Sequence, residues 1–366
     1  MKPKLSKETA YKSLQDFFIE NPKPMVIFGT GTSCSLDPVF GMQALKECLL
    51  DQVHAFESIA QHEWEKVKDA LNSGVDLENA MNAVSSDFLI KEIVKITANF
   101  IGAKNSLFSI PLLSGDKIWP AQTLFKRIID HLPETDKCLH VATTNYDLLA
   151  EYSFTYAGIP YITGFSGGIL RKSNWERAER VVIHNKKIVE KNKLHLRRTT
   201  EKYIRLYKMH GSLNVFDFNG DFVENDEWIK SIPDSGNITR IMVTPGISKI
   251  SEINNRRQYL TTKFDDSFKR HNAFLFLGFG FNDKHIINIP LEQKFTNHGS
   301  YGIIITKESN ERIDTLLDKS ENLWLVCEDS SSGGTSISNS RYGEKCLLPD
   351  RKIWMFENFT TEIFGV

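Results

Sequence analysis

Short apolar runs separated by stretches with helical spacing recur along this chain, and the pattern predicts buried parallel strands that alternate with helices. The most continuous runs are Met25–Phe28, Cys138–Ala142 and Ala273–Leu277. A helix is predicted over residues 5–20, where apolar side chains recur every three or four positions. This alternation is typical of a Rossmann-like α/β fold, a parallel sheet with helices on both faces. Further predicted elements are strands at Tyr203–Met209, Arg240–Gly246, Tyr301–Thr306 and Leu323–Cys327, a hairpin turn at Asn219-Gly220 and a helix over about 254–270.

Two regions depart from the alternation. Residues of about 51–131 carry apolar side chains at helical spacing with few strand-like runs, which predicts a helical insertion into a domain spanning 1–328. We expect the Trp and Phe side chains of this insertion to be interior packing. Residues 329–366 begin with a Ser/Gly-rich stretch expected to be a flexible linker. The aromatic tail that follows is expected to dock on its own domain or on a neighbouring subunit.

Composition narrows the function classes. The chain has 366 residues, 41% of them hydrophobic, and a net charge of −1, so it is globular and has no overall attraction for nucleic acid. A basic stretch at 171–202 is diluted by acidic neighbours and is expected to be solvated surface, with nucleic-acid contact as the less favoured alternative. No apolar run is long enough to span a bilayer, and the first residues lack the apolar core of a signal peptide, so we expect a cytoplasmic protein.

Four predicted strands end in small or polar residues. These ends are Gly29–Ser33, Thr143–Asp147, His210-Gly211 and Gly278–Asp283. Each has an ordinary alternative: helix caps at the second, tight turns at the glycines, and a turn-bonded histidine at the third. In a doubly wound sheet, however, the carboxyl ends of the strands converge on one crevice. The coincidence of all four therefore favours a ligand site.

The same residues resemble the sirtuin family, and specifically its bacterial NAD-hydrolysing branch. Gly29–Ser33 (G-T-G-T-S) is similar to the family's G-A-G-x-S phosphate loop, with Asp37–Phe40 in the place of its cofactor loop. Thr143–Asp147 (T-T-N-Y-D) is similar to T-Q-N-I-D, and His210-Gly211 matches the H-G that carries the catalytic histidine. The segment Leu277–His285 resembles the L-G-Y-S-F-x-D-x-H segment of that branch.

Two departures from the family pattern matter. Protein-deacylating sirtuins carry two C-x-x-C pairs that bind zinc, and this chain has no such pair, so deacylation is doubtful and no metal is expected. Thr144 replaces the glutamine of T-Q-N-I-D, as in the hydrolase branch. The resemblance to that branch implies antiphage defence by NAD+ depletion. It also implies a homo-oligomer that acts with a hexameric helicase-type ATPase or another sensor partner.

The resemblance assigns NAD+ as substrate and a role to each motif residue. Asn145 would orient water, His210 would accept a proton, and Asp147 would favour the oxocarbenium-like centre that remains when nicotinamide leaves. A carboxylate at Asp147 could equally hydrogen-bond the loop backbone. The alternatives to hydrolysis are a module that senses NAD or ADP-ribose without turnover and, less favoured, a protein deacylase. The residues expected to bind the cofactor are Gly29, Thr30, Gly31, Thr32, Ser33, Asp37, Phe40, Thr144, Gly278, Gly280, Asn282 and Asp283.

Overall fold

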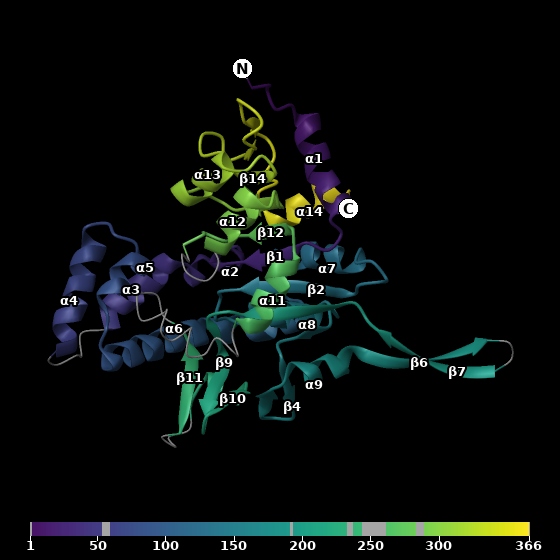
Figure 1. The fold of residues 1–366 in the computed structure, drawn as a ribbon. Coiled ribbons are helices and arrows are strands. Elements are labelled where there is room, and N and C mark those ends of the chain that lie inside the picture. The colour runs from purple at the N-terminus through teal and green to yellow at the C-terminus, as the bar shows by residue number, and fades with distance from the viewer. Residues whose placement is uncertain are drawn as a thin grey trace.

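The computed structural model describes residues 2–52, 59–190, 193–232, 237–243, 261–282 and 289–365. Its centre is a nine-stranded sheet in the order β16-β15-β14-β13-β12-β1-β2-β8-β3 (Figure 1). The strands from β14 to β3 run parallel, while β15 and β16 are antiparallel. The predicted Rossmann-like α/β class is therefore confirmed. The strands are β1 (Met25–Phe28), β2 (Cys138–Thr143), β3 (Tyr161–Ile162), β8 (Tyr203–Lys208), β12 (Ala273–Leu277), β13 (Tyr301–Ile305), β14 (Leu323–Glu328), β15 (Thr335–Ser338) and β16 (Cys346–Leu348).

Helices cover both faces of this sheet, because each central strand is apolar on both sides. In β1, Val26 and Phe28 belong to one apolar core, whereas Met25 and Ile27 belong to the other. The first core is completed by α1 (Lys7–Glu20), α7 (Gln122–Asp130), α8 (Leu149–Tyr156) and α14 (Phe356–Phe364). The second is completed by α11 (Thr262–Arg270), α12 (Ile289–Asn297) and α13 (Glu311–Asp318).

The order of the strands reverses between β1 and β12. From β1 the chain proceeds to β2 and β8 on one side, and from β12 it proceeds to β13 and β14 on the other. A parallel sheet leaves a crevice beyond the strand ends at such a switch point, and ligands bind there in open α/β folds.

The helical insertion lies beside the end of β1 that leads into α2 (Thr30–Cys34), and its longest helix extends into the main domain (Figure 1). Trp64, Leu71 and Ile93 form part of its own core, whereas Phe108, further along the same long helix as Ile93, packs in the main core. The helix α7 also packs in the main core, so the predicted boundary at 131 lies beyond the insertion's own packing. The insertion and the segment before it comprise η1 (Pro38–Phe40), α3 (Met42–Gln52), α4 (Ile59–Asn72), α5 (Leu77–Ala80), η3 (Met81–Ala83) and α6 (Asp87–Ser114).

Between β3 and α11 the chain forms a second, antiparallel sheet in the order β11-β9-β10-β5-β4. Asn219 and Gly220 form the β9–β10 turn with positive φ values of 54° and 84°, which confirms the predicted hairpin. The strand predicted over 240–246 overlaps β11, which ends at Met242. Residues 244–260, which include the rest of that predicted strand and the start of the helix predicted over 254–270, lie outside the described residues. The elements of this region are β4 (Phe165–Gly167), β5 (Arg171–Ser173), α9 (Trp175–Glu179), η4 (Arg180–Val182), β6 (Ile183–Glu190), β7 (Lys193–Thr200), β9 (Gly211–Phe218), β10 (Asp221–Glu224), η5 (Glu227–Ile229) and β11 (Ile238–Met242).

The C-terminal segment differs from its prediction. The Ser/Gly-rich stretch is a tight turn and not a flexible linker, because the carboxylate of Asp329 accepts hydrogen bonds from the hydroxyls of Ser331 and Ser332 and β15 then pairs with β14. The aromatic tail docks on its own chain, where α14 packs against α1 and α7. Among the helices that the structure describes, none is both long and apolar enough to cross a membrane.

Candidate functional site

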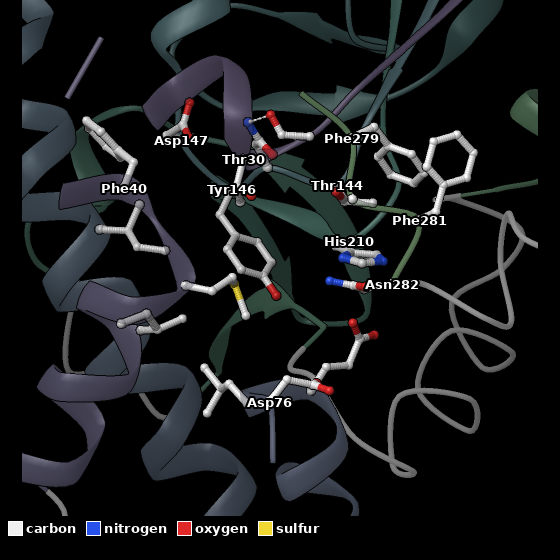
Figure 2. A pocket seen from close by; sticks show the side chains of 18 of the residues that line it. Thr30, Phe40, Asp76, Thr144, Tyr146, Asp147, His210, Phe279, Phe281 and Asn282 are labelled. Atoms are coloured by element: carbon white, nitrogen blue, oxygen red, sulfur yellow. Dashed lines mark hydrogen bonds between the residues drawn. The ribbon is translucent and has the colours of Figure 1, made fainter. Parts of the chain in front are cut away.

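A cavity of about 190 Å³ lies at the carboxyl ends of the central strands, beside the switch point (Figure 2). It has two walls of different character. The sheet wall consists of strand-end residues Gly29, Thr30, Thr144, Asn145, Tyr146, Asp147, His210, Phe279, Gly280, Phe281 and Asn282. The insert wall consists of Phe40, Met42, Leu45, Asp76, Leu77, Glu78, Phe100 and Ile101.

Glycines let the ends of β1 and β12 come into contact beneath the cavity. The Gly29 N–H donates to the Leu277 carbonyl at 3.1 Å, and the Gly31 N–H donates to the Gly278 carbonyl at 3.0 Å. A Cβ atom on Gly31 would lie 2.6 Å from the Gly278 Cα atom, closer than side chains tolerate. Gly278 itself has a φ of +51°, which favours glycine. The closely spaced glycines thus have a packing role at the switch point.

Asn145 is fixed by the loop that follows β1. Its Nδ2 atom donates to the Gly29 carbonyl at 3.1 Å and to the Ser33 hydroxyl at 3.0 Å, so both amide hydrogens are used. The side chain is 3% exposed, and its Oδ1 atom has no hydrogen-bond partner among the described residues. A buried acceptor left without a hydrogen bond lowers the stability of the folded state by about 1–3 kcal/mol, so we expect this atom to accept a hydrogen bond from a group that enters the site. A water or a ligand hydroxyl in the cavity would satisfy it.

Asp147, which also lines the cavity, supports this arrangement. One carboxylate oxygen accepts from the Ser33 hydroxyl at 2.8 Å, and the other accepts from the Leu149 N–H at 3.3 Å. Burial raises the pKa of Asp147, against the opposing effects of the Lys208 ammonium and the Ser33 hydroxyl. The alternative that Asp147 hydrogen-bonds the loop backbone thus holds in this structure. Through Ser33, the same carboxylate sets the orientation of the Asn145 amide.

A buried ion pair lies next to Asp147. The Lys208 ammonium contacts the Glu151 carboxylate at 2.9 Å, and both side chains are less than a tenth exposed. Burial raises the pKa of Glu151, while Lys208 opposes the rise. One lysine therefore faces two buried carboxylates, Asp147 and Glu151.

His210 lies in the turn between β8 and β9, on the sheet wall (Figure 2). It is 8% exposed, and its carbonyl accepts from the Val243 N–H at 2.9 Å. The Tyr146 hydroxyl donates to the Val243 carbonyl at 2.5 Å, and the rings of Tyr146 and His210 lie 6.4 Å apart. Val243, directly after β11, thus holds the Tyr146 ring and the backbone of His210 at the cavity.

Several residues predicted to contact the nucleotide do not line the cavity. The Thr32 hydroxyl donates to the Gly29 carbonyl at 2.8 Å, and the Ser33 hydroxyl is bound to Asp147 as described above. The Asp37 carboxylate accepts from the Val39 N–H at 2.9 Å and caps η1. Thr32 and Ser33, together with Gly31 and Gly278, support the sheet wall, whereas Asp37 supports the turn that carries Phe40 of the insert wall. Their direct contact with a nucleotide stays a prediction, because the structure shows only that they do not line this cavity.

Other predicted residues do lie at the cavity: Gly29, Thr30, Phe40, Thr144, Gly280 and Asn282. The β12 loop that carries the last two is anchored by α13 and its cap. The Gly280 carbonyl accepts from the Asn310 Nδ2 atom at 2.8 Å, and the Asn282 Oδ1 atom accepts from the Arg312 guanidinium at 3.1 Å. Asp283 lies outside the described residues. Whether these residues bind a nucleotide stays a prediction.

Sequence reasoning missed two groups of lining residues. Tyr146, Phe279 and Phe281 lie within the motifs, but aromatic residues at strand ends are usually core and gave no separate signal. The insert wall was missed almost entirely, with only Phe40 predicted. Leu77 and Phe100 have the helical spacing of ordinary core residues, and nothing in that spacing indicates that they border a cavity.

Comparison with known proteins supports the resemblance to the sirtuin family, whereas the NAD-hydrolysing branch stays a prediction. No curated protein matches the chain significantly. The family model described as a SIR2-like domain matches residues 139–322, half of the chain. The matched range includes Asn145, Asp147, His210 and the end of β12, whereas the Gly29–Ser33 loop lies before it. A domain of this kind is compatible with NAD-dependent activity, and the chain belongs to the SIR2-like domain family.

Proposed function

We propose that this protein is an NAD+ hydrolase, which cleaves NAD+ to nicotinamide and ADP-ribose. The observation that carries the proposal is the unpaired Oδ1 atom of Asn145, a buried acceptor on a residue that lines the cavity together with His210. Membership of the SIR2-like family adds NAD+ as the expected substrate. The position of the cavity beyond the carboxyl ends of β1 and β12 also suits a dinucleotide.

In this proposal Asn145 orients the groups that react. Its amide is held by two hydrogen bonds, so the Oδ1 atom is preorganised to accept from a ribose hydroxyl or from the attacking water. The bond between the ribose carbon and the nicotinamide nitrogen breaks, and its electron pair goes to the nitrogen. The water oxygen then bonds to the ribose carbon, which yields ADP-ribose.

His210 takes up the proton that this water loses. Imidazole is the side chain that most often transfers protons near neutral pH, and the backbone of Val243 fixes the turn that carries this one. Asp147 acts as a positioning residue, because both of its oxygens are bound within the protein. The aromatic rings of Phe279, Phe281 and Phe100 exclude bulk water from the cavity and accommodate the nicotinamide, which becomes uncharged as it leaves the ribose.

The biological role that we propose is based only on the resemblance to the bacterial NAD-hydrolysing branch of the sirtuin family. It includes antiphage defence by NAD+ depletion, in a homo-oligomer activated by a hexameric helicase-type ATPase or another sensor partner. A deacylase is disfavoured because the sequence has no cysteine between Cys138 and Cys327, and thus no zinc-binding C-x-x-C pairs after His210.

The test is incubation of the purified protein with NAD+, with nicotinamide and ADP-ribose separated by chromatography. We expect both products in equal amounts, without any peptide present. Nicotinamide release that depends on an acylated peptide would replace the proposal with deacylation. Calorimetric binding of NAD+ without cleavage, in the presence of cell extract from infected bacteria as well as alone, would replace it with a sensor.

A further inference from the structure

Strands β6 and β7 form a separate two-stranded ribbon, which we call the arm (residues 183–200). They pair antiparallel from Ile183 opposite Thr200 to Glu190 opposite Lys193, and no strand of either larger sheet joins them within the described residues. Figure 1 shows the arm extending away from the body of the molecule. Eight residues per strand give it a length of roughly 26 Å. An isolated two-stranded ribbon is only marginally stable in water, so an arm of this length suggests a binding partner.

The arm carries exposed cations that lack acidic partners. Lys186, Lys187, Arg197 and Arg198 are exposed, and none forms an ion pair with a described carboxylate. The neighbouring acids are already paired with other cations. Glu201 contacts His184 at 3.0 Å, Glu134 contacts Lys137 at 2.8 Å, and Asp136 contacts Lys23. The positive charge of the arm therefore remains available to an external anion.

The strand register places these cations on both faces of the ribbon. Lys186 lies directly opposite Arg197, and Asn185 lies opposite Arg198. Because successive side chains point to opposite faces, Lys186 and Arg197 share one face, while Lys187 and Arg198 share the other. Like charges directly opposite each other destabilise a ribbon, so the pair of Lys186 and Arg197 favours a bound anion between them.

The root of the arm adds a polar cavity of about 670 Å³. Its lining includes Lys186, Arg197 and Arg198 from the arm, together with the hydroxyl-bearing Thr199 and Thr200. Lys137 lines it from the body of the molecule, as do Glu134 and Asp136, the two carboxylates that are paired with Lys137 and Lys23. Ammonium, guanidinium and hydroxyl groups are the side-chain donors that contact phosphate oxygens in nucleic-acid complexes.

We propose that the arm binds duplex DNA, with the ribbon in the major groove and its two basic faces toward the two phosphate backbones. The major groove of B-form DNA is about 12 Å wide and admits a two-stranded ribbon, whereas the major groove of A-form RNA is too narrow for side chains to read. To contact cations on both faces of a thin ribbon, a ligand must lie on both sides of it. The two walls of a DNA groove lie on both sides of a ribbon inserted between them.

An acidic protein fits the arm less well. Protein interfaces have an apolar centre with few charged residues. Leu196, at 66% exposure, is the one large apolar side chain that the described arm residues expose. The binding of the arm to DNA goes beyond the NAD+ hydrolysis proposed above, because the arm and the cavity between the two walls share no lining residue.

The experiment measures fluorescence anisotropy of a labelled 30-base-pair DNA duplex, titrated with the full-length protein at about 50 and 200 mM salt. A triple variant, Lys186→Ala with Arg197→Ala and Arg198→Ala, is compared with a control that also removes three exposed positive charges, the lysines Lys12, Lys345 and Lys352. We expect wild type and control to bind with the same affinity. The arm variant should bind more than about tenfold more weakly, and the slope of log affinity against log salt should decrease by about 3.

Further measurements test whether the arm enters a groove and whether its ligand is DNA. Lys187→Ala with Arg198→Ala should weaken binding as much as Lys186→Ala with Arg197→Ala, whereas a loss confined to one face would overturn insertion into a groove. Equal affinity of the triple variant and wild type, or tighter binding to polyglutamate or duplex RNA than to duplex DNA, would overturn the proposal. Circular dichroism checks that each variant is folded. NAD+ cleavage should be unchanged in the arm variants, so this result is independent of the hydrolase proposal.

Discussion

The two walls of the central cavity are built in different ways. The sheet wall is fixed by hydrogen bonds between distant parts of the chain, such as those from Asn145 to Gly29 and Ser33. The insert wall is mostly apolar, and residues such as Leu77 and Phe100 are held by packing within the helical insertion. Hydrogen bonds fix the direction of individual atoms, whereas apolar packing fixes shape and volume. We infer that the sheet wall sets the reaction and the insert wall sets the affinity for substrate.

The largest expected effect is on the sheet wall, at His210. His210→Ala removes the proposed proton acceptor and should lower the rate of NAD+ cleavage by about 10²–10⁴-fold, with little change in KM. His298→Ala is the matched control, because His298 is exposed and lies outside the cavity. Steady-state kinetics on both variants make the comparison. Turnover by His210→Ala at the wild-type rate would remove His210 from the mechanism.

The second effect tests the support beneath the sheet wall. Gly31→Ala places a Cβ atom 2.6 Å from the Gly278 Cα atom, so the ends of β1 and β12 must separate. We expect a loss of about 3 kcal/mol in the free energy of unfolding, measured with urea. Gly168→Ala serves as control, since nothing lies within 4 Å of a Cβ atom there. Equal stability of the two variants would mean that the glycine contact does not hold the strand ends together.

The third effect concerns the buried pair of Lys208 and Glu151 beside Asp147 and is measured as a pH dependence of stability. Burial raises the pKa of Glu151 above its ordinary value of 4.5, so the folded state binds this proton more tightly than the unfolded state. The stability contributed by the protonated form is complete below about pH 4.5 and is lost as the pH rises through the raised pKa.

Glu151→Gln removes this titration. The free energy of unfolding of wild type relative to the variant should therefore fall as the pH rises above 4.5, by at most about 1.4 kcal/mol per pH unit. Thermal or urea unfolding between pH 4 and 8 would measure it, with Glu308→Gln, an exposed carboxylate, as control. A difference that rises with pH over this range would contradict the assignment.

The smallest expected effect is on the insert wall. Phe100→Ala removes an apolar contact that substrate and transition state share, so KM should rise roughly fivefold to tenfold while kcat changes little. Phe88→Ala, in the same helix but 57% exposed and outside the cavity, should leave both constants unchanged. If Phe100→Ala lowered kcat as strongly as His210→Ala, the distinction between the two walls would fail.

The same difference explains what the sequence could predict. Strand ends with Asn145, His210 and the glycines were identified because apolar runs locate the strands and parallel strands bring their ends together. The sequence pattern could not show which groups face the cavity. Thr32 and Ser33 turn inward because the Gly29 carbonyl and the Asp147 carboxylate accept from their hydroxyls, contacts that depend on three-dimensional packing.

The insert wall was beyond prediction for a related reason. A helix that lines a cavity and a helix that fills a core present the same apolar spacing, and α6 does both along its length. At the C-terminal stretch, by contrast, the composition predicts the wrong local structure. Serines and glycines at 330–336 are typical of linkers, but here the Asp329 carboxylate binds two of the serine hydroxyls and closes a tight turn.

The most direct test of the account is NAD+ cleavage by two asparagine variants, Asn145→Ala and Asn339→Ala. Both side chains are buried and donate two hydrogen bonds to the protein, but the Asn339 Oδ1 atom accepts from the Arg341 N–H, whereas that of Asn145 has no partner among the described residues. We predict that Asn339→Ala loses stability and keeps the wild-type kcat, while Asn145→Ala loses about 10²–10³-fold in kcat. Equal kcat values for wild type and Asn145→Ala would contradict the claim that this unpaired oxygen acts on the substrate.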